Sequence, residues 1–215
     1  MVRRLELERL LQSVETNPSP KAFLEQYTIP ADVAAEVLLT AAHMNNDIIG
    51  KSVADLGCGT GRLAIGATFL GAIESVGIDL DAPSVRIARK NAVKLSVRDI
   101  TQWIIGDLDV LHGNFHTVIQ NPPFGVQRRS ADRKFLVKAL ELAPVVYSLH
   151  KSGEGSRAFI KRFIERRGGK VTSIYQMRLN IPRMFEFHTH SKHEVEVDLY
   201  RIESARRSKD ASSTI

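Results

Sequence analysis

The chain has 215 residues, 43% of them hydrophobic, which suffices for one ordinary domain with a full core. No apolar run approaches membrane-spanning length, and a single cysteine, Cys58, excludes an internal disulfide framework and a cysteine-based zinc site. The net charge of +6 favours an anionic partner such as nucleic acid over simple solubility charge. The first residues lack the apolar segment of a secretory signal, so we expect a cytoplasmic protein without a membrane partner.

The N-terminal part of the chain carries two helical patterns joined by a proline-containing loop. Residues 2–16 have an apolar stripe at helical spacing, and residues 31–44 show a second one directly after Pro30. The last residues are polar and predict a flexible tail. We therefore expect a helical extension that contributes to a cofactor pocket, a main domain and a flexible tail, at residues 1–29, 30–203 and 204–215.

From residue 51 onward, short apolar segments alternate with helical segments. The expected strands cover residues 51–57, 74–81, 101–107, 115–120 and 143–150. The expected helices cover residues 61–71, 82–95, 132–142 and 156–168. This alternation is typical of a parallel sheet with helices on both faces. Two more strands, at 170–181 and 192–203, follow each other without a helix, so we expect them to pair antiparallel at one side of the sheet. The predicted fold is α/β and Rossmann-like, with seven mostly parallel strands and an antiparallel last strand.

A glycine-rich turn, DLGCGTG at residues 55–61, follows the first of these strands and opens a helix. Gly57, Gly59 and Gly61 permit a tight turn and let a ligand approach the backbone closely. The following helix offers free N–H groups to an anionic group. A tight turn without a ligand is the alternative interpretation.

Two carboxylates at the ends of the next strands favour a nucleoside ligand. Asp79 follows Gly57 at about the 20-residue spacing expected for a carboxylate that binds ribose hydroxyls. The glycine spacing differs from the pyrophosphate-binding fingerprint, so S-adenosylmethionine fits better than a dinucleotide. Asp107 ends the third strand and is placed to hydrogen-bond an adenine amino group, although a turn or capping role explains it equally well. Ligands bind at the carboxyl edge of such sheets, where these residues meet.

The segment QNPPFG, residues 120–125, forms a stiff turn behind the fourth strand because each proline lacks an N–H and has a fixed φ. The side-chain oxygen of Asn121 and the carbonyl of Pro122 can accept the two N–H bonds of an exocyclic amine and aim its lone pair at a methyl group. Pro123 adds rigidity, and Phe124 can stack on a planar substrate. The alternative is an ordinary Asn-Pro turn with a core phenylalanine.

Six segments of the chain resemble, in the same order, the methyltransferase-like protein 5 family of class I methyltransferases. They are LEQY (24–27), ADLGCGTGRLAIG (54–66), GIDLD (77–81), VIQNPPFG (118–125), VYSLHKS (146–152) and EVEVDLYR (194–201). The resemblance implies N6-methylation of an adenine in structured small-subunit ribosomal RNA, with S-adenosylmethionine as cofactor. It implies a cofactor pocket lined by Gln26, Thr28, Asp55, Gly57, Gly59, Thr60, Gly61, Arg62, Asp79, Leu80, Asp107, Leu108 and Asn121.

The resemblance also implies two partners. One is a small zinc-containing activator protein of the Trm112 type, which would pair along a sheet edge. The strand at residues 101–107, with an exposed Trp103, is our candidate for that edge, although a tryptophan in a strand is more often a core residue. The other partner is the RNA, and our candidate contacts are Arg128, Arg129, Lys151, His188 and Lys192. The segment FHTHSKH, residues 187–193, has three histidines but contains no carboxylate or thiol of its own, so we expect no metal site there.

Two other functions remain open from the sequence. A protein glutamine methyltransferase acting on release factors uses the same amine-holding chemistry on a side-chain amide. Phe124 in place of the tyrosine usual in that group, the short N-terminal part and the basic charge argue against it. A non-catalytic RNA-binding module is the second alternative, and the intact glycine turn and Asn121 argue against that one.

Overall fold

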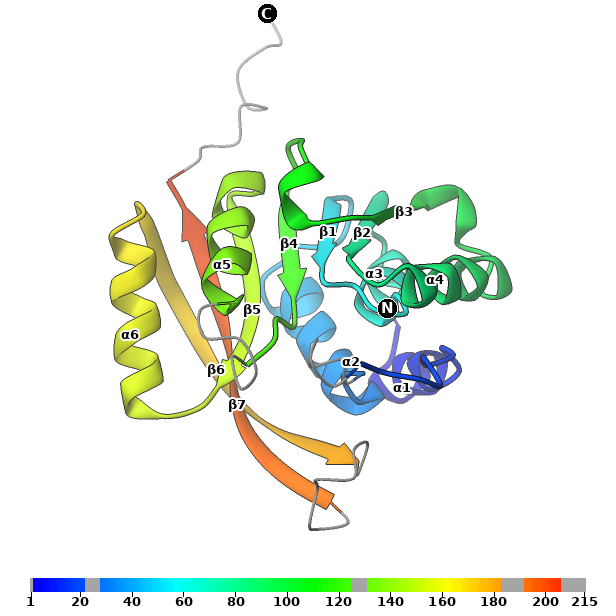
Figure 1. The fold of residues 1–215 in the computed structure, drawn as a ribbon, viewed down its shortest axis with the longest axis horizontal. Helices are drawn as coiled ribbons and strands as arrows, with labels where there is room; N and C mark the ends of the chain where they lie inside the picture. The colour runs from blue at the N-terminus through cyan, green and yellow to red at the C-terminus, as the bar shows by residue number, and fades with distance from the viewer. Residues whose placement is uncertain (1, 22–27, 125–130, 183–191, 206–215) are drawn as a thin grey trace, which may run out of the picture.

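The computed structural model describes residues 2–21, 28–124, 131–182 and 192–205. Their strands form one seven-stranded sheet in the order β3-β2-β1-β4-β5-β7-β6 (Figure 1). The strands are β1 (Ser52–Leu56), β2 (Glu74–Asp79), β3 (Thr101–Ile105), β4 (Thr117–Gln120), β5 (Val145–Lys151), β6 (Gly169–Pro182) and β7 (Lys192–Ser204). The strands β1 to β5 are parallel, and β7 runs antiparallel to both β5 and β6. The predicted fold class and the antiparallel pairing of the last two strands are therefore confirmed.

The helices cover both faces of the sheet, as predicted. They are α1 (Arg4–Gln12), α2 (Ala31–Leu39), α3 (Arg62–Phe69), α4 (Ala82–Lys94), α5 (Ala131–Leu142) and α6 (Glu154–Glu165). On one face, α1, α2 and α3 pack against Val53 and Ile119, and on the other α5 and α6 pack against Ala54 and Val118. Strands buried on both faces explain why the central strands are continuous apolar runs. None of the helices in these parts of the chain is long and apolar enough to cross a membrane.

Local residues account for the helix boundaries. The side chain of Asp81 caps α4 by accepting a 3.0 Å hydrogen bond from the N–H of Ser84. The helix α1 is shorter than predicted, since it ends at Gln12, where the hydroxyl of Ser13 donates to the carbonyl of Leu10. The predicted helix at 31–44 is α-helical only to Leu39 and continues as a π-helical turn, Thr40–Met44.

The N-terminal extension belongs to the same core as the main domain. Leu7 and Leu11 of α1 are fully buried in the cluster that α2 and α3 share. The buried guanidinium of Arg62, at the start of α3, donates to the backbone carbonyls of Val14 and Ile29. Because Arg62 directly follows the glycine turn, these bonds hold the extension beside the carboxyl edge of the sheet.

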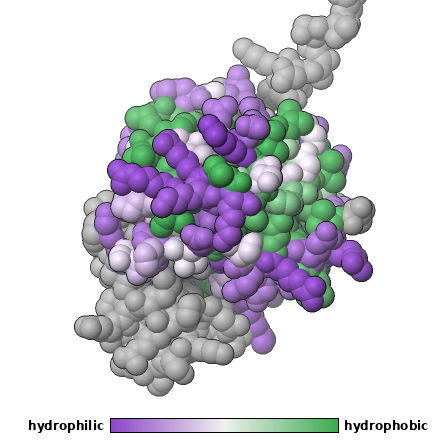
Figure 2. Space-filling model, turned by 90° about the vertical axis from the view of Figure 1, so that its right-hand side faces the viewer, coloured by the Kyte–Doolittle hydropathy of each residue, from purple (hydrophilic) through white to green (hydrophobic). Residues whose placement is uncertain are grey.

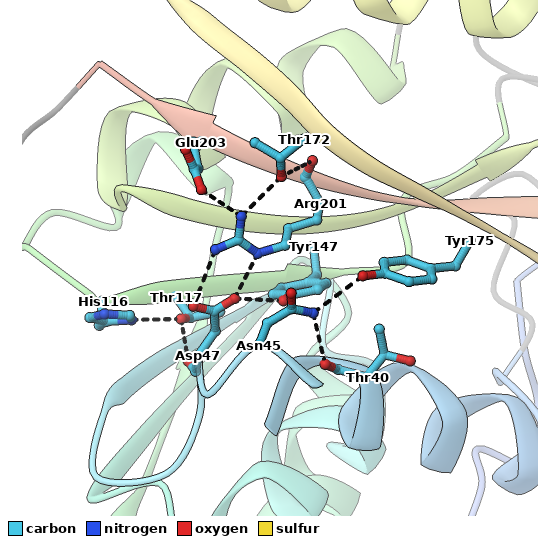
Figure 3. A network of polar contacts seen from close by, with 10 residues as sticks. All are labelled: Thr40, Asn45, Asp47, His116, Thr117, Tyr147, Thr172, Tyr175, Arg201 and Glu203. Carbon is cyan, nitrogen blue, oxygen red and sulfur yellow. Dashed lines mark hydrogen bonds and ion pairs between the residues drawn. The ribbon is translucent and has the colours of Figure 1, made fainter. Parts of the chain in front are cut away.

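A buried ion pair ties three strands together away from that edge (Figure 3). The carboxylate of Asp47 accepts hydrogen bonds from the hydroxyl of Tyr147 at 2.6 Å and from Nε of Arg201 at 2.9 Å. The backbone carbonyl of Asp47 accepts the hydroxyl of Thr117, the first residue of β4. Burial and the neighbouring carboxylate raise the pKa of Tyr147 well above its ordinary value. The network therefore fixes the loop before β1 against β4, β5 and β7.

The strands β6 and β7 extend beyond the rest of the sheet. Val197 lies opposite Lys151, the last residue of β5, whereas β7 pairs with β6 from Lys192 onward. Residues 178–182 and 192–196 thus form a two-stranded arm that projects past the carboxyl end of β5, as Figure 1 shows. The arm therefore lies on the side of the molecule where the parallel strands end.

Candidate active site at the carboxyl edge of the sheet

The glycine turn forms a narrow cradle between the ends of β1 and β2. Gly57, Gly59 and Gly61 all have positive φ, at 71°, 52° and 88°. The N–H groups of Gly57 and Cys58 donate to the carbonyl of Ile78 at 2.9 and 3.0 Å. The turn is closed by a 2.8 Å bond from the N–H of Gly61 to the carbonyl of Cys58. The predicted turn therefore has the left-handed conformations that favour glycine.

Two glycines also make room for the indole ring of Trp103. A Cβ at Gly61 would lie 2.4 Å from Cη2 of Trp103, and a Cβ at Gly77 would lie 2.6 Å from Cζ3. The ring therefore packs, half-buried, beneath the glycine turn, where its Nε1 has no hydrogen-bond partner among the described residues. The expectation of an exposed tryptophan is therefore wrong. The backbone of β3 lies at the edge of the sheet, but the side chain of Trp103 points towards the core. The expectation that residues 101–107 form an edge strand is confirmed by the position of β3.

Asp55 lies near the end of β1, and one of its two carboxylate oxygens accepts a hydrogen bond. Its Oδ2 accepts the N–H of Ala64 at 3.0 Å, and its Oδ1 is buried with no hydrogen-bond partner in the described parts of the chain. Burial raises the pKa of Asp55 to about 7, the Ala64 hydrogen bond lowers it, and the charge of Asp79 adds to the increase. Such a carboxyl group needs a donor or a cation that these residues do not supply.

Asp79 lies at the end of β2, beside the glycine turn. Its two oxygens accept the N–H groups of Gly59 and Asp81, each at 2.8 Å. Burial raises the pKa of Asp79 above its usual range, although both hydrogen bonds act in the opposite direction. Leu80, next in the chain, is 54% exposed and offers an apolar surface beside the carboxylate. Asp79 thus lies at the end of β2, where the sequence places a carboxylate for ribose hydroxyls, and the role itself stays a prediction.

Asp107 follows β3 and is less free to bind a ligand than predicted. Its side chain accepts the N–H of Asp109 at 3.1 Å and forms an ion pair with Lys134 of α5. The Lys134 hydrogen bond is the main reason that the pKa of Asp107 is lowered. The capping role that the sequence left open is therefore present, and Leu108 is buried in the adjacent 3₁₀ turn.

Asn121 lies directly behind β4, whose last residue, Gln120, pairs with Leu56 of β1 just before the glycine turn. Its side-chain oxygen is buried and has no hydrogen-bond partner among the residues that the structure describes. Pro122 is buried, and Phe124 packs partly buried against the core formed with α1 and α2. The turn thus presents an unsatisfied acceptor at a fixed place, as the two prolines predict. The packing of Phe124 matches the alternative of a core phenylalanine more closely than a ring placed for stacking.

Of the other predicted site residues, some lie in or beside the glycine turn and others lie away from it. Thr60 lies in the glycine turn, and its buried hydroxyl has no partner in the described regions. The guanidinium of Arg62 is turned towards the N-terminal extension. Thr28 is half-buried at the end of that extension, and Lys151 is exposed at the end of β5. Four predicted residues and one side chain lie outside what the structure describes, namely Gln26, Arg128, Arg129, His188 and the side chain of Lys192.

Several polar residues that support the site have no recognisable sequence signal. Asn91 of α4 is buried and joins the extension to the glycine turn, since its amide donates to the carbonyls of Glu15 and Thr60 at 3.0 Å. Lys21 forms a 2.8 Å ion pair with the buried Asp81. A lone Asn or Lys in an amphipathic segment predicts only a solvated face, so these bonds were not foreseen.

A second unforeseen group lies beneath Asn121. Gln120 donates to the hydroxyl of Ser148 at 2.9 Å, and that hydroxyl lies 2.7 Å from Nε2 of His150. All three side chains are buried, and burial lowers the pKa of His150 to about 4. A neutral row of hydrogen bonds therefore fixes the strand ends from which the Asn-Pro-Pro turn departs.

These features fit S-adenosylmethionine. The unpartnered oxygens of Asp55 and Thr60 face a turn that can hold the ammonium and carboxylate of its methionine part, and Asp79 with Leu80 can hold its ribose and adenine. Its sulfonium group supplies an activated methyl. Within the described residues, no group of three His, Cys, Asp or Glu side chains could hold a metal ion.

Comparisons with known proteins show to which family the chain belongs. A family model described as the methyltransferase small domain matches residues 28–142. The rRNA N(6)-adenosine-methyltransferase Mettl5 of Drosophila melanogaster is 37% identical over 92% of this chain and 94% of its own length. The protein MJ0284 of Methanocaldococcus jannaschii is 42% identical over 94% of this chain and 95% of its own.

The fold is shared with a solved structure of similar size. The crystal structure of PH1948 from Pyrococcus horikoshii superposes with a TM-score of 0.87 at 38% identity, covering 95% of this chain and 98% of that one. The glycine cradle, the carboxylates at the ends of β1 and β2, and these relatives lead to one conclusion. The chain belongs to the methyltransferase-like protein 5 family of S-adenosylmethionine-dependent methyltransferases.

Proposed function

We propose that this methyltransferase transfers a methyl group to N6 of an adenine in structured small-subunit ribosomal RNA. The observation that carries the proposal is the side-chain oxygen of Asn121, a buried acceptor without a partner among the described residues, next to the cofactor cradle. The relatives from Drosophila melanogaster and Danio rerio are both named rRNA N(6)-adenosine-methyltransferases. The adenine would leave its stack to reach this acceptor.

The Asn-Pro-Pro turn performs the chemistry mainly by positioning. The lone pair of an exocyclic amine is delocalised into the base, which makes the nitrogen a poor nucleophile. Asn121 Oδ1 and the Pro122 carbonyl accept its two N–H bonds, favour a pyramidal nitrogen and aim the lone pair at the methyl group. Orientation supplies most of the rate because the methyl is already activated. The proton becomes acidic once the nitrogen bonds the methyl and is then released to water, so no strong general base is needed.

The N-terminal extension, residues 1–29, would complete the cofactor pocket through Gln26 and Thr28. The hydrogen bonds from Arg62 to the backbone of this extension support that role, because they hold it beside the glycine turn. We also propose that Arg128, Arg129, Lys151, His188 and Lys192 contact RNA. The exposed position of Lys151 at the carboxyl end of β5 supports this set. A ribosomal RNA substrate is consistent with a cytoplasmic location.

The edge strand β3 is the proposed attachment site of a zinc-containing activator of the Trm112 type. One side of β3 has no neighbouring strand among the described residues, because β3 is the first strand in the sheet order. The carbonyl of Trp103 accepts the guanidinium of Arg89 at 2.9 Å, so pairing with a partner strand there would displace this side chain. Ile100, Ile105 and Val110 at and around this strand are 40%, 43% and 56% exposed. Figure 2 shows the side of the molecule that carries β3 and α4, where hydrophobic residues are exposed between hydrophilic ones. An apolar strip along a free strand edge suits strand pairing with a partner.

The test is methyl transfer to two substrates in parallel. The purified chain, with and without the zinc-containing protein, is incubated with S-adenosylmethionine and either unmodified small-subunit rRNA or a release factor. Nucleosides and peptides are then analysed by mass spectrometry. We expect N6-methyladenosine in the rRNA and an unmodified release factor. Methylglutamine in the release factor with unmodified RNA would overturn the proposal in favour of the glutamine methyltransferase, and RNA binding without any methyl transfer would favour the non-catalytic module.

A further inference from the structure

We propose that the cleft between α5 and α6 binds the RNA strand that flanks the methylated adenine. The cleft has a volume of about 300 Å³, and its walls include Arg133, Val137, Phe163 and Arg167. The inference rests on the proposed function, because it assigns a second contact to the same RNA substrate. None of the residues that form these walls belongs to the Asn-Pro-Pro turn or to the cofactor cradle.

Two positive charges in the cleft are uncompensated. Four cationic side chains line it, and two of them are already paired: Lys134 with Asp109 at 2.8 Å and Lys138 with Glu141 at 3.3 Å. Arg133 and Arg167 are exposed, and neither guanidinium has a carboxylate partner within the described residues. Two unpaired guanidinium groups attract two anionic groups of a ligand.

Each of these arginines is held in place by an aromatic ring. The guanidinium carbon of Arg133 lies 4.8 Å from the ring centroid of Phe159, and that of Arg167 lies 3.7 Å from the centroid of Phe163. Arg167 also donates from one terminal nitrogen to the carbonyl of Phe163 at 3.2 Å. Stacking on a ring fixes the plane of each guanidinium, which suits phosphate binding by the remaining N–H groups. The centroids of Phe159 and Phe163 are 5.7 Å apart, so the two arginine–phenylalanine stacks are neighbours along α6.

The cleft begins beside the active site and leads into the most basic part of the chain. The helix α5 follows the Asn-Pro-Pro turn, and its Lys134 reaches the carboxylate of Asp107 behind β3. Figure 1 shows α5 and α6 side by side over one end of the sheet. Residues 154–170 contain six Lys or Arg and two Glu, so this segment of α6 and the following turn holds most of the net charge of +6. A strand bound at the Asn121 site can therefore continue into this cleft.

The combination of groups favours RNA over an acidic protein. Surfaces that bind single-stranded nucleic acid combine basic side chains with aromatic rings. The basic side chains bind phosphates, and the rings stack on bases or on arginines. A cleft of about 300 Å³ accommodates a nucleotide but is too small for the helix of a partner protein. Guanidinium groups cover the half-buried rings of Phe159 and Phe163. Docking of a protein would instead favour rings that are exposed as an apolar surface.

The test compares two double variants that remove the same charge. Arg133→Gln with Arg167→Gln alters the cleft, and Arg86→Gln with Lys90→Gln alters the exposed side of α4 as a matched control. Affinity for transcribed small-subunit rRNA is measured by fluorescence anisotropy at several salt concentrations. Methyl transfer is measured on the same rRNA and on a short oligonucleotide that contains only the methylated adenine and its immediate neighbours. S-adenosylmethionine affinity and thermal unfolding verify that both variants are folded.

We expect the cleft variant to bind the rRNA at least about tenfold more weakly. The slope of log K against log salt concentration should become shallower by about 1.4, because two phosphate contacts are lost at about 0.7 each on a single strand. Its KM for rRNA should rise with kcat unchanged, and its activity on the short oligonucleotide should equal that of the wild type. The α4 variant should change RNA affinity less than twofold. Arg167→Lys should keep the salt dependence and still weaken binding, because lysine keeps the charge and loses the planar stack.

Equal RNA affinities for the two double variants would overturn the inference. So would an unchanged RNA affinity combined with weaker binding of the zinc-containing activator, which would make the cleft a protein interface. The proposed function is judged separately: a wild-type chain that binds RNA through the cleft but transfers no methyl group to it refutes that function and leaves the cleft assignment standing.

Discussion

The backbone N–H of Gly59 donates a 2.8 Å hydrogen bond to Oδ2 of Asp79, which ties the glycine turn after β1 to the end of β2. The other oxygen of the same carboxylate accepts the N–H of Asp81 at 2.8 Å. Both oxygens are thus oriented by backbone groups before any ligand binds. A carboxylate held in this way loses little conformational freedom when it accepts the hydroxyls of a ribose, so its contribution to affinity is large.

Asp79→Ala is expected to weaken the binding of S-adenosylmethionine by about 10- to 150-fold. Hydrogen bonds to a charged group contribute about 1.5–3 kcal/mol each, and the substitution also releases the turn at Gly59. Isothermal titration calorimetry measures the change. Asp99→Asn, an exposed carboxylate in the 3₁₀ turn before β3, serves as the control and should bind like the wild type. Equal affinities for the Asp79 variant and the wild type would remove Asp79 from the cofactor site.

Asn121→Ala is expected to lower kcat by about 10²–10³-fold, the loss typical of removing one preorganised hydrogen-bonding group from an active site. The cofactor affinity should stay near that of the wild type, because the role of this side chain is to hold the amine. Single-turnover methylation of rRNA and calorimetric titration with S-adenosylmethionine separate the two effects. If cofactor binding were lost with catalysis, the Asn-Pro-Pro turn would be part of the cofactor pocket and not the holder of the amine.

The affinity for S-adenosylmethionine is expected to rise with pH through about 7. Burial holds the pKa of Asp55 at about 7 in the ligand-free protein, so below that pH the carboxyl group is protonated and cannot attract the ammonium of the cofactor. Binding then requires the loss of a proton, and affinity increases by up to about tenfold per pH unit until Asp55 is ionised. Calorimetry between about pH 5.5 and 6.5 measures this slope, about one pH unit below the pKa of about 7.7–8.0 at which an α-ammonium group titrates.

Asp55→Asn is the matched variant for this pH dependence. It should bind the cofactor more weakly at neutral pH and show a much flatter profile. A wild-type profile that is flat over the same range would show that Asp55 is already ionised in the ligand-free protein.

Asp47→Ala is expected to lower the free energy of unfolding by about 3–5 kcal/mol. The side chains of Asp47 and Arg201 are 7% and 14% exposed. Removing Asp47 leaves the buried Arg201 with only the half-exposed Glu203 as ion partner and leaves the buried hydroxyl of Tyr147 without its acceptor. Glu8→Ala breaks the Arg4–Glu8 pair on the surface of α1 and should cost less than about 1 kcal/mol. Urea unfolding followed by circular dichroism compares them, and similar losses for the two variants would show that the buried network contributes no more than a surface pair.

The sequence by itself determined the order of the elements and the identity of the cofactor cradle. Period-2 and period-3.6 patterns depend on near neighbours in the chain, and the glycine spacing at 55–61 reflects a local need for positive φ. The position of Asp79 could be predicted because parallel strands bring their carboxyl ends to one edge. The stiffness of the Asn-Pro-Pro turn is likewise a local property of its two prolines.

Only the tertiary structure decided which side chains meet across the sheet. The indole of Trp103 reaches the glycine turn because Gly61 and Gly77 leave it space, and a strand pattern alone cannot show that. Asp107 forms an ion pair with Lys134 of α5, a helix that follows the Asn-Pro-Pro turn in the chain, whereas Asp107 precedes it. Pairs such as these join residues far apart in the chain. Their partners are selected by packing geometry, and no local pattern carries that information.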